Sequence, residues 1–287
     1  MSEMLQVVAQ ISVLVFVLSS MLAMGLSLTV AQVLEPLRNT RLVILALLAN
    51  FMLVPLLAYL ILLVIPLEQG LATGLIIMAC AAGAPFLPKL AQTAKGNIAF
   101  SVGLMTLLMV VTVIYLPLVL PLLLQGASVS PWAIAQSLIV MMLLPLGIGL
   151  LVKARYESLA DTLQPHLSQA STVAILLMIV SMLVLQFSSI IGLIGTGGLV
   201  AILVFLVGAF ILGFILGGRE SGIKSVLGLG TGQRNLSAAF LVAAQNFADD
   251  PNVLIMVLVA GIVGLVILGG LAGELGKRSE AGEQAVV

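Results

Sequence analysis

The chain has 287 residues, of which 62% are hydrophobic and only 8% are charged. Soluble domains carry about 25% charged residues and about 45–50% apolar residues, so this composition indicates a membrane protein with many spans. The 11 Lys and Arg residues balance the 11 Asp and Glu residues, which leaves no basic face for nucleic acid. The apolar runs are long and do not alternate, which favours helices over a β-barrel. We therefore expect an all-α polytopic protein whose main partner is the lipid bilayer.

The single cysteine, Cys80, excludes a disulfide framework and a metal site built from a cysteine cluster. We interpret it as a small apolar residue packed in a helix. The N-terminal residues Met1-Ser2-Glu3-Met4 lack the basic region of a secretory signal, so we expect the first helix to be retained.

A membrane-spanning helix needs about 20 apolar residues, and this length predicts nine helices in one transmembrane domain over residues 1–287. The expected ranges are 5–30, 41–65, 70–93, 97–124, 131–152, 168–190, 198–217, 222–247 and 251–274. The longest loop is then 153–167, where Glu157, Asp161 and His166 are expected to be solvated.

The basic residues predict the orientation of the chain. If the N-terminus is outside, the outer loops hold no Lys or Arg, and nearly all basic residues are cytoplasmic. These residues are Arg38, Arg41, Lys95, Lys153, Arg155, Arg219, Lys224, Lys277 and Arg278. An even number of helices would scatter them over both sides. We therefore expect an integral protein of the bacterial inner membrane with a cytoplasmic C-terminus.

The predicted third helix (70–93) cannot cross a membrane as one continuous rod. Its apolar part is about a dozen residues, which span about 18 Å, against a hydrocarbon core of about 30 Å. Gly83, Pro85 and Pro88 follow it, and proline removes a backbone donor and interrupts the helical ladder. We therefore expect two half-helices separated by a break.

The predicted eighth helix (222–247) has the same defect in the opposite chain direction. The run 228–235 interrupts it with glycines and polar residues, and we expect Gly230 and Gly232 to lie in the break. The run also contains Arg234, and an arginine at mid-bilayer costs roughly 2.5–3.5 kcal/mol on an insertion scale. Interrupted segments at matching positions of two oppositely oriented halves predict an inverted-repeat transporter with its site at the breaks.

The two breaks carry the charge expected of an anion site. Half-helix N-termini attract anions, and Lys89 and Arg234 add positive charge with no acidic residue predicted inside the membrane. An unpaired buried cation is costly, so we expect a substrate carboxylate to complete a site that includes Gln233, Asn235 and Thr231. As alternatives, Lys89 extends to the cytoplasmic surface, and C=O groups of the broken helices satisfy Arg234.

Three short motifs of the sequence carry a resemblance to a known family. They are Ala94-Lys95-Gly96-Asn97 with Ser101, Asn50-Phe51 followed by Pro55-Leu56, and Thr231-Gly232-Gln233-Arg234-Asn235. In these motifs the sequence resembles the bile acid:sodium symporter family, over nearly the whole chain by topology. The resemblance implies a panel domain of helices 5–30, 131–152 and 168–190. It also implies a core domain of residues 41–124 and 198–274, with the substrate between the two domains.

The sodium ligands that the resemblance implies are largely replaced in this chain. The family's acidic ligand falls on Gly230, its glutamine falls on Arg234, and its Ser-Asn pair falls on Leu87-Pro88. A cation, Lys89 or Arg234, lies close to each vacated position, so we expect transport without sodium and without any cofactor or metal. The polar positions that remain are Ser101, Asn235 and Asn50, the last in place of a glutamine.

We therefore expect a secondary transporter that moves a small organic anion by alternating access. An enzyme is not expected, because no intramembrane carboxylate pair, His–Glu motif or paired nucleophile and base occurs. The alternatives are a sodium-coupled symporter of bile acids or other organic anions, an arsenite-type metalloid permease that uses Cys80, and a non-transporting receptor or scaffold of the same fold. The sequence favours no particular oligomeric state.

Overall fold

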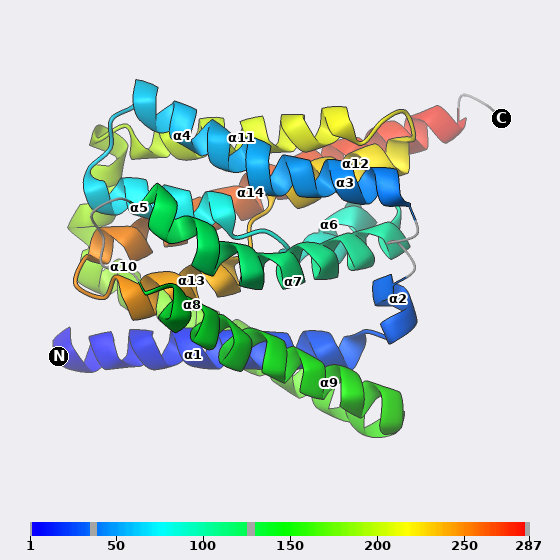
Figure 1. The fold of residues 1–287 in the computed structure, drawn as a ribbon, viewed down its shortest axis with the longest axis horizontal. Helices are drawn as coiled ribbons and strands as arrows, with labels where there is room; N and C mark the ends of the chain where they lie inside the picture. The colour runs from blue at the N-terminus through cyan, green and yellow to red at the C-terminus, as the bar shows by residue number, and fades with distance from the viewer. Residues whose placement is uncertain (1, 35–38, 125–129, 285–287) are drawn as a thin grey trace.

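The computed structural model describes residues 2–34, 39–124 and 130–284, and within these ranges every regular element is helical (Figure 1). The helices are α1 (Ser2–Ser27), α2 (Val30–Leu34), α3 (Thr40–Leu48), α4 (Val54–Val64), α5 (Gln69–Cys80), α6 (Leu87–Thr93), α7 (Ile98–Leu123), α8 (Pro131–Leu138), α9 (Leu144–Arg155), α10 (Glu157–Gly195), α11 (Gly198–Leu216), α12 (Ser221–Gly232), α13 (Leu236–Asn246) and α14 (Pro251–Gln284). Two π-helical turns, Ala49–Leu53 and Ile139–Leu143, join α3 to α4 and α8 to α9.

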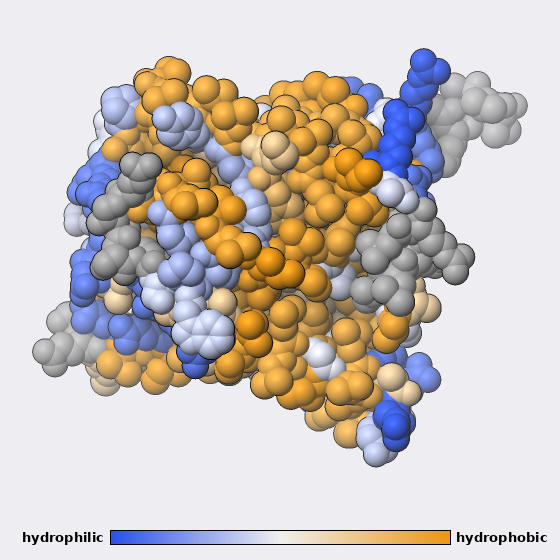
Figure 2. Space-filling model, viewed as in Figure 1, coloured by the Kyte–Doolittle hydropathy of each residue, from blue (hydrophilic) through white to orange (hydrophobic). Residues whose placement is uncertain are grey.

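Seven continuous helical segments in the described ranges are long and apolar enough to cross a membrane. Two further crossings are made by pairs of short helices, α5 with α6 and α12 with α13. Both broken helices and the polytopic all-α architecture are therefore confirmed. The surface agrees, because a broad apolar belt separates polar margins at the two ends of the helices (Figure 2).

The prediction of a loop at 153–167 is wrong, because almost all of these residues are helical. Helix α9 continues to Arg155, and only Tyr156 separates it from α10. The Nζ atom of Lys153 lies 2.7 Å from Oδ1 of Asp161 and 3.2 Å from Oε1 of Glu157. These ion pairs hold the polar first turns of α10 against the end of α9. The polar residues at 153–167 therefore belong to helices that extend beyond the apolar belt. Helix α14 likewise continues past the predicted end at 274.

The helices that begin or end with basic residues share one end of the molecule. Helix α3 begins, α9 ends and α12 begins at the right of Figure 1, and the N-terminus lies at the left. Arg41, Lys153, Arg155 and Lys224 belong to these helix ends. Arg38 lies outside the described residues. The asymmetry on which the orientation depends is therefore present in the fold, and the cytoplasmic assignment of this end stays a prediction.

Helices α1, α9 and α10 pack on one another along one side of the molecule, at the bottom of Figure 1. The backbones of α1 and α9 touch where two glycines meet. A Cβ atom on Gly149 would lie 2.8 Å from Cα of Gly25 and 2.7 Å from the carbonyl oxygen of Leu22. Small residues allow such close approach, which strengthens van der Waals packing between helices in lipid.

The contact between α1 and α9 predicts opposite effects for two glycines of α9. Gly149→Ala should destabilise the protein, because overpacking costs about 1–3 kcal/mol and the atoms it meets belong to backbone. Gly147→Ala is the matched control, since a Cβ there meets nothing within 4 Å. Thermal unfolding of the purified protein in detergent measures both variants. Equal midpoints for the two variants would contradict the close contact.

Candidate functional site: the crossing of the broken helices

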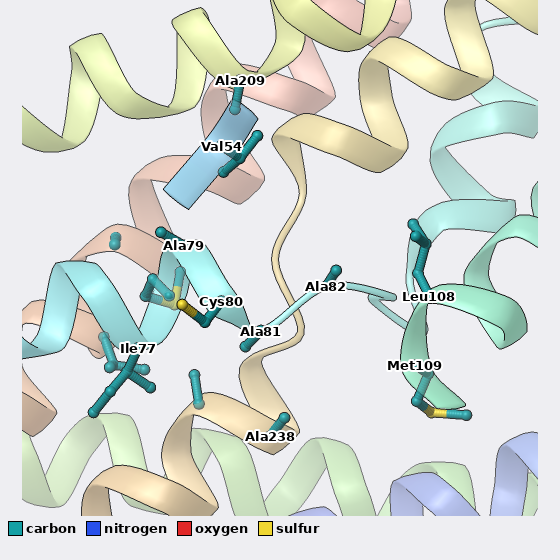
Figure 3. Packing of buried hydrophobic residues seen from close by; sticks show 14 of the residues in the cluster. Val54, Ile77, Ala79, Cys80, Ala81, Ala82, Leu108, Met109, Ala209 and Ala238 are labelled. Carbon is teal, nitrogen blue, oxygen red and sulfur yellow. The ribbon is translucent and has the colours of Figure 1, made fainter. Parts of the chain in front are cut away.

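The two breaks lie side by side and are joined by hydrogen bonds. The first runs from Ala81, with extended backbone, through Gly83, whose φ is +82°. The second runs over residues 233–235. The backbone N–H of Asn235 donates to the carbonyl oxygen of Ala81 at 2.9 Å, and its side-chain Nδ2 donates to that of Gly83 at 2.9 Å. Figure 3 shows Ala81 and Ala82 in the first break. Beside them runs the second break, which leads into α13, the helix that carries Ala238.

The second break begins after the glycine run and not within it. Gly230 and Gly232 are the last part of α12, and they serve close packing. A Cβ atom on Gly230 would lie 2.8 Å from Cδ2 of Leu87. In the first break, Pro85 lies in the turn before α6, whereas Pro88 lies in the first turn of α6, where proline is tolerated. Gly230 thus lets α12 pack against α6, whereas a Cβ atom on Gly232 would lie 2.9 Å from Cδ2 of Leu268 on α14. The polar residues that follow form the break.

Helix α7 supports the first break through a residue that the sequence did not single out. Oγ1 of Thr112 accepts a hydrogen bond from the backbone N–H of Ala82 and donates to its carbonyl oxygen, both at 3.0 Å. A Cβ atom on Gly83 would lie 2.2 Å from the backbone nitrogen of Met109, so the link passes directly over α7. A threonine within a long apolar helix is the sequence feature that could have indicated this role.

The guanidinium group of Arg234 lies at the centre of the crossing and is bonded to neutral oxygens. Its side chain donates to the carbonyl oxygens of Met78 at 2.9 Å, Ala79 at 2.8 Å and Thr231 at 3.0 Å, and to Oδ1 of Asn50 at 2.9 Å. These bonds use four of the five N–H donors of arginine. The carbonyls belong to the last turns of α5 and α12, where the helix dipole is negative. Arg234 is only 2% exposed, and no carboxylate among the described residues pairs with it.

Asn50 is aimed at the arginine by the π-helical turn in which it lies. Its Nδ2 atom donates to the carbonyl oxygen of Ala46 at 3.0 Å and to Oγ1 of Thr231 at 3.2 Å, which leaves Oδ1 to accept from Arg234. The hydroxyl of Tyr115 donates to the carbonyl oxygen of Phe51 at 2.6 Å within the same turn. π-helical turns are frequent at functional sites, and here the turn places a polar side chain in an apolar layer.

The structure brings together five of the predicted site residues and places two elsewhere. Arg234, Asn50, Thr231 and Asn235 share hydrogen bonds or adjacent backbone at the crossing, and Gln233 belongs to the same link. The predicted residues that lie elsewhere are Lys89 and Ser101. Lys89 is exposed on α6, with its Nζ atom 3.3 Å from Oε1 of Gln92. Ser101 is buried in α7 and donates to the carbonyl oxygen of Ile98 in its own helix at 2.6 Å.

A cavity of about 510 Å³ lies between the crossing and helices α1 and α10. Its wall combines apolar side chains, such as Phe16 and Ile175, with several hydroxyl and amide groups. The polar lining residues are Ser20, Ser27, Gln164, Ser168, Ser171, Thr172, Gln233 and Ser237. Arg234 is the only charged residue in the described lining. Of the α10 residues in this wall, only Gln164 lay in the predicted loop; the others lay in the predicted helix 168–190 but were not singled out, although positions 164, 168, 171, 172 and 175 form one helical face.

Two features beside Arg234 leave polar groups available at the cavity. Leu236 and Ser237 line it and form the first turn of α13, where backbone N–H groups have no acceptor within the helix. Asn235 caps this end by accepting from the N–H of Ala238 at 3.1 Å. Oε1 of Gln233 is buried and has no hydrogen-bond partner within the described structure. A buried acceptor without a donor costs about 1–3 kcal/mol, so Gln233 is poised to change its contacts.

The comparisons with known proteins agree with this architecture. The family model described as the sodium bile acid symporter family matches residues 13–193, a range that includes the first broken helix and ends before the second. The chain is 29% identical over 227 residues to the probable sodium/metabolite cotransporter BASS3, chloroplastic, of Arabidopsis thaliana, which covers 76% of this chain and 53% of that protein. It is 28% identical over 258 residues to the corresponding BASS2 protein of Oryza sativa subsp. japonica, covering 88% of this chain and 60% of that protein. The chain thus spans between half and two thirds of the length of these relatives.

The hydrogen bonds of Arg234 predict a graded loss of stability. Arg234→Met leaves three carbonyl oxygens and one amide oxygen buried without their donor, so we expect a loss of roughly 3 kcal/mol or more, at about 1–3 kcal/mol per unsatisfied group. Arg234→Lys keeps the charge but has three donors on one nitrogen, and should lie between this variant and the wild type. Thermal unfolding in detergent tests this order, with the exposed Lys89→Met as the control. A wild-type midpoint for Arg234→Met would show that the bonds do not stabilise the fold.

Proposed function

The chain belongs to the sodium bile acid symporter family, and from this premise we propose that it is a secondary transporter of a small organic anion. The observation that carries the proposal is the cavity of about 510 Å³ beside the crossing, whose only charged lining residue among those described is an arginine. The partners of Arg234 are neutral dipoles, so its positive charge is not cancelled by a carboxylate. The free N–H groups at the start of α13 add to the attraction for an anion.

Alternating access is supported by the way the cavity is bounded. In the proposed division, helices α1, α8, α9 and α10 form the panel, and the remaining transmembrane helices form the core. Toward the start of α1, the panel and the core close on each other. The rings of Phe16 and Phe240 meet edge to face with centroids 6.4 Å apart, and the Oγ atoms of Ser20 and Ser237 are 3.3 Å apart. The cavity extends instead toward Ser27, the last residue of α1. Rocking of the panel against the core would open one side as the other closes.

Sodium independence is the finer part of the proposal, and the environment of Arg234 supports it. Sodium in broken-helix transporters is coordinated by unwound backbone carbonyls and the C-terminal ends of half-helices. Here those groups at the ends of α5 and α12 accept hydrogen bonds from the guanidinium group. The position that corresponds to the family's acidic ligand is Gly230, so no carboxylate competes for a free cation. The guanidinium group of Arg234, a cation fixed to the chain, thus takes the place of an exchangeable sodium ion.

The arsenite-type permease, one of the alternatives, would need a thiol at the cavity, and the described lining contains none. Cys80 is fully buried at the end of α5, and it does not line the cavity. A non-transporting scaffold would share the fold, and measured transport separates it from the proposed function.

The first functional prediction concerns sodium. A thermal-shift screen of the purified protein against carboxylates, sulfonates and bile salts selects the substrate, and uptake of that compound into proteoliposomes is then measured. Because Arg234 fills the cation position, uptake should be the same with sodium chloride and choline chloride at constant membrane potential. Strong stimulation by sodium would refute the finer proposal and leave the transporter assignment intact. Complete absence of uptake of every stabilising compound would favour the scaffold.

A second prediction tests the tethered cation directly. Arg234→Ala leaves the three carbonyl oxygens and Oδ1 of Asn50 around an empty volume, which is a donor set of hard oxygens suited to a small cation. Sodium chloride should therefore raise the unfolding temperature of Arg234→Ala more than choline chloride does, while the wild type responds to both salts alike. Lys89→Ala controls for a general effect of charge removal. Equal responses of Arg234→Ala to the two salts would mean that the oxygens do not form a cation site.

A further inference from the structure

A groove at one end of the helices combines two arginines with an apolar wall, and it shares no lining residue with the substrate cavity. Its volume is about 530 Å³, and it lies between the start of α3 and the link from α11 to α12. Arg41 and Arg219 contribute the charge, and Leu42, Leu45 and Leu216 contribute apolar surface. None of these residues takes part in the proposed transport site.

The groove lies where two membrane spans end. The apolar helical segments Thr40–Val64 and Gly198–Leu216 begin and end at its edge. Arg41 is therefore at the level of the lipid headgroups, while Leu45, one helical turn further along α3, is at the level of the acyl chains. The apolar surface continues outside the groove, because Ile44 and Ile215 are 58% and 67% exposed on the same two helices. The groove thus places charged side chains next to an apolar wall, in the same order as the charged headgroup and the acyl chains of a phospholipid.

The charges of the groove are available to a ligand. Arg41 and Arg219 are both exposed, and neither forms an ion pair within the described part of the chain. Glu220 is the one carboxylate in the lining, so the net charge of the lining is positive. The first turn of α3 adds N–H groups without helical acceptors, beyond the one that Asn39 caps at 3.2 Å. Arginine pairs bidentately with phosphate oxygens, which makes a phosphodiester the fitting anion.

The glycine pair at the end of α11 keeps the groove open. Gly218 has φ of +79°, and a Cβ atom there would meet nothing within 4 Å, so no side chain covers the groove at this position. A Cβ atom on Gly217 would lie 2.5 Å from Cα of Lys224, so this glycine lets the end of α11 pack directly on α12. The pair therefore forms a tight corner between two helices and leaves space beside it.

We propose that this groove binds an anionic phospholipid, with the lipid phosphate between Arg41 and Arg219 and one acyl chain against Leu42, Leu45 and Leu216. Basic pockets between transmembrane helices suit anionic headgroups, and each Lys or Arg near the surface strengthens such binding about fivefold. A soluble phosphate would use only the arginines. The lipid uses both the charge and the apolar wall.

The experiment compares lipids that differ only in the headgroup. The purified full chain in an uncharged detergent is mixed with equal amounts of dioleoyl phosphatidylglycerol and dioleoyl phosphatidylcholine, and native mass spectrometry measures the lipid retained. The wild type should prefer phosphatidylglycerol. Arg41→Gln and Arg219→Gln should each lower this preference about fivefold, and the double variant should lower it about twenty-five-fold. Both side chains are exposed, so their replacement should leave the packing of the helices intact, and thermal unfolding checks this.

Two further variants make the test specific to the groove. Arg155→Gln removes an exposed arginine from the end of α9, outside the groove, and should leave the preference unchanged. Glu220→Gln removes the one carboxylate of the lining and should raise the preference about fivefold. The proposal is overturned if the wild type retains both lipids equally, or if Arg155→Gln acts as strongly as Arg41→Gln. It is also overturned if soluble glycerol phosphate displaces phosphatidylglycerol at equal concentration, because the apolar wall would then contribute nothing.

Discussion

The hydrogen bonding of one guanidinium group holds the ends of two half-helices together. A helix that stops inside a membrane leaves carbonyl groups without donors, and each such group costs several kcal/mol in hydrocarbon. Arg234 supplies donors to the last turns of both α5 and α12, and also to Asn50 on a third transmembrane segment. The opposite charges of the helix ends and the side chain reinforce these bonds. The broken helices can therefore be stable in lipid without a bound ion.

A cation that is covalently part of the chain changes the energetics of the proposed cycle. An exchangeable ion stabilises the crossing only while it is bound, so its release can be coupled to substrate release. Arg234 cannot leave, so it would stabilise the crossing throughout the proposed cycle. In the proposed sodium-independent cycle the substrate gradient would supply the driving force, and the crossing would move as one rigid part of the proposed core. Any ligand still shifts the equilibrium only as far as its affinity differs between the two states.

Much of this fold follows from residue patterns that a membrane makes informative. Apolar length predicts the spans, and an apolar segment too short to cross, followed by Gly83 and Pro85, predicts the first break. The partners of Arg234 could not be predicted, because they are backbone carbonyls from α5, about 155 residues away in the sequence, and any residue has such a carbonyl. The location of the second break was misjudged because glycine serves close packing as well as unwinding, and at Gly230 packing against Leu87 decides. The start of α10 was missed since its polar turns depend on ion pairs with the end of α9.

Helix α12 connects the two sites that the structure suggests. It begins beside Glu220 and Ile223 at the basic groove and ends at Thr231 and Gly232 in the crossing. Helix α11 accompanies it, because a Cβ atom on Gly213 would lie 2.4 Å from Oγ1 of Thr231. The groove is lined only by residues 39–45 and 216–223, which belong to the proposed core, so its shape should not change if the proposed panel rocks. A lipid bound there would interact equally with both proposed states, and it would stabilise the core without favouring either open side of the transporter.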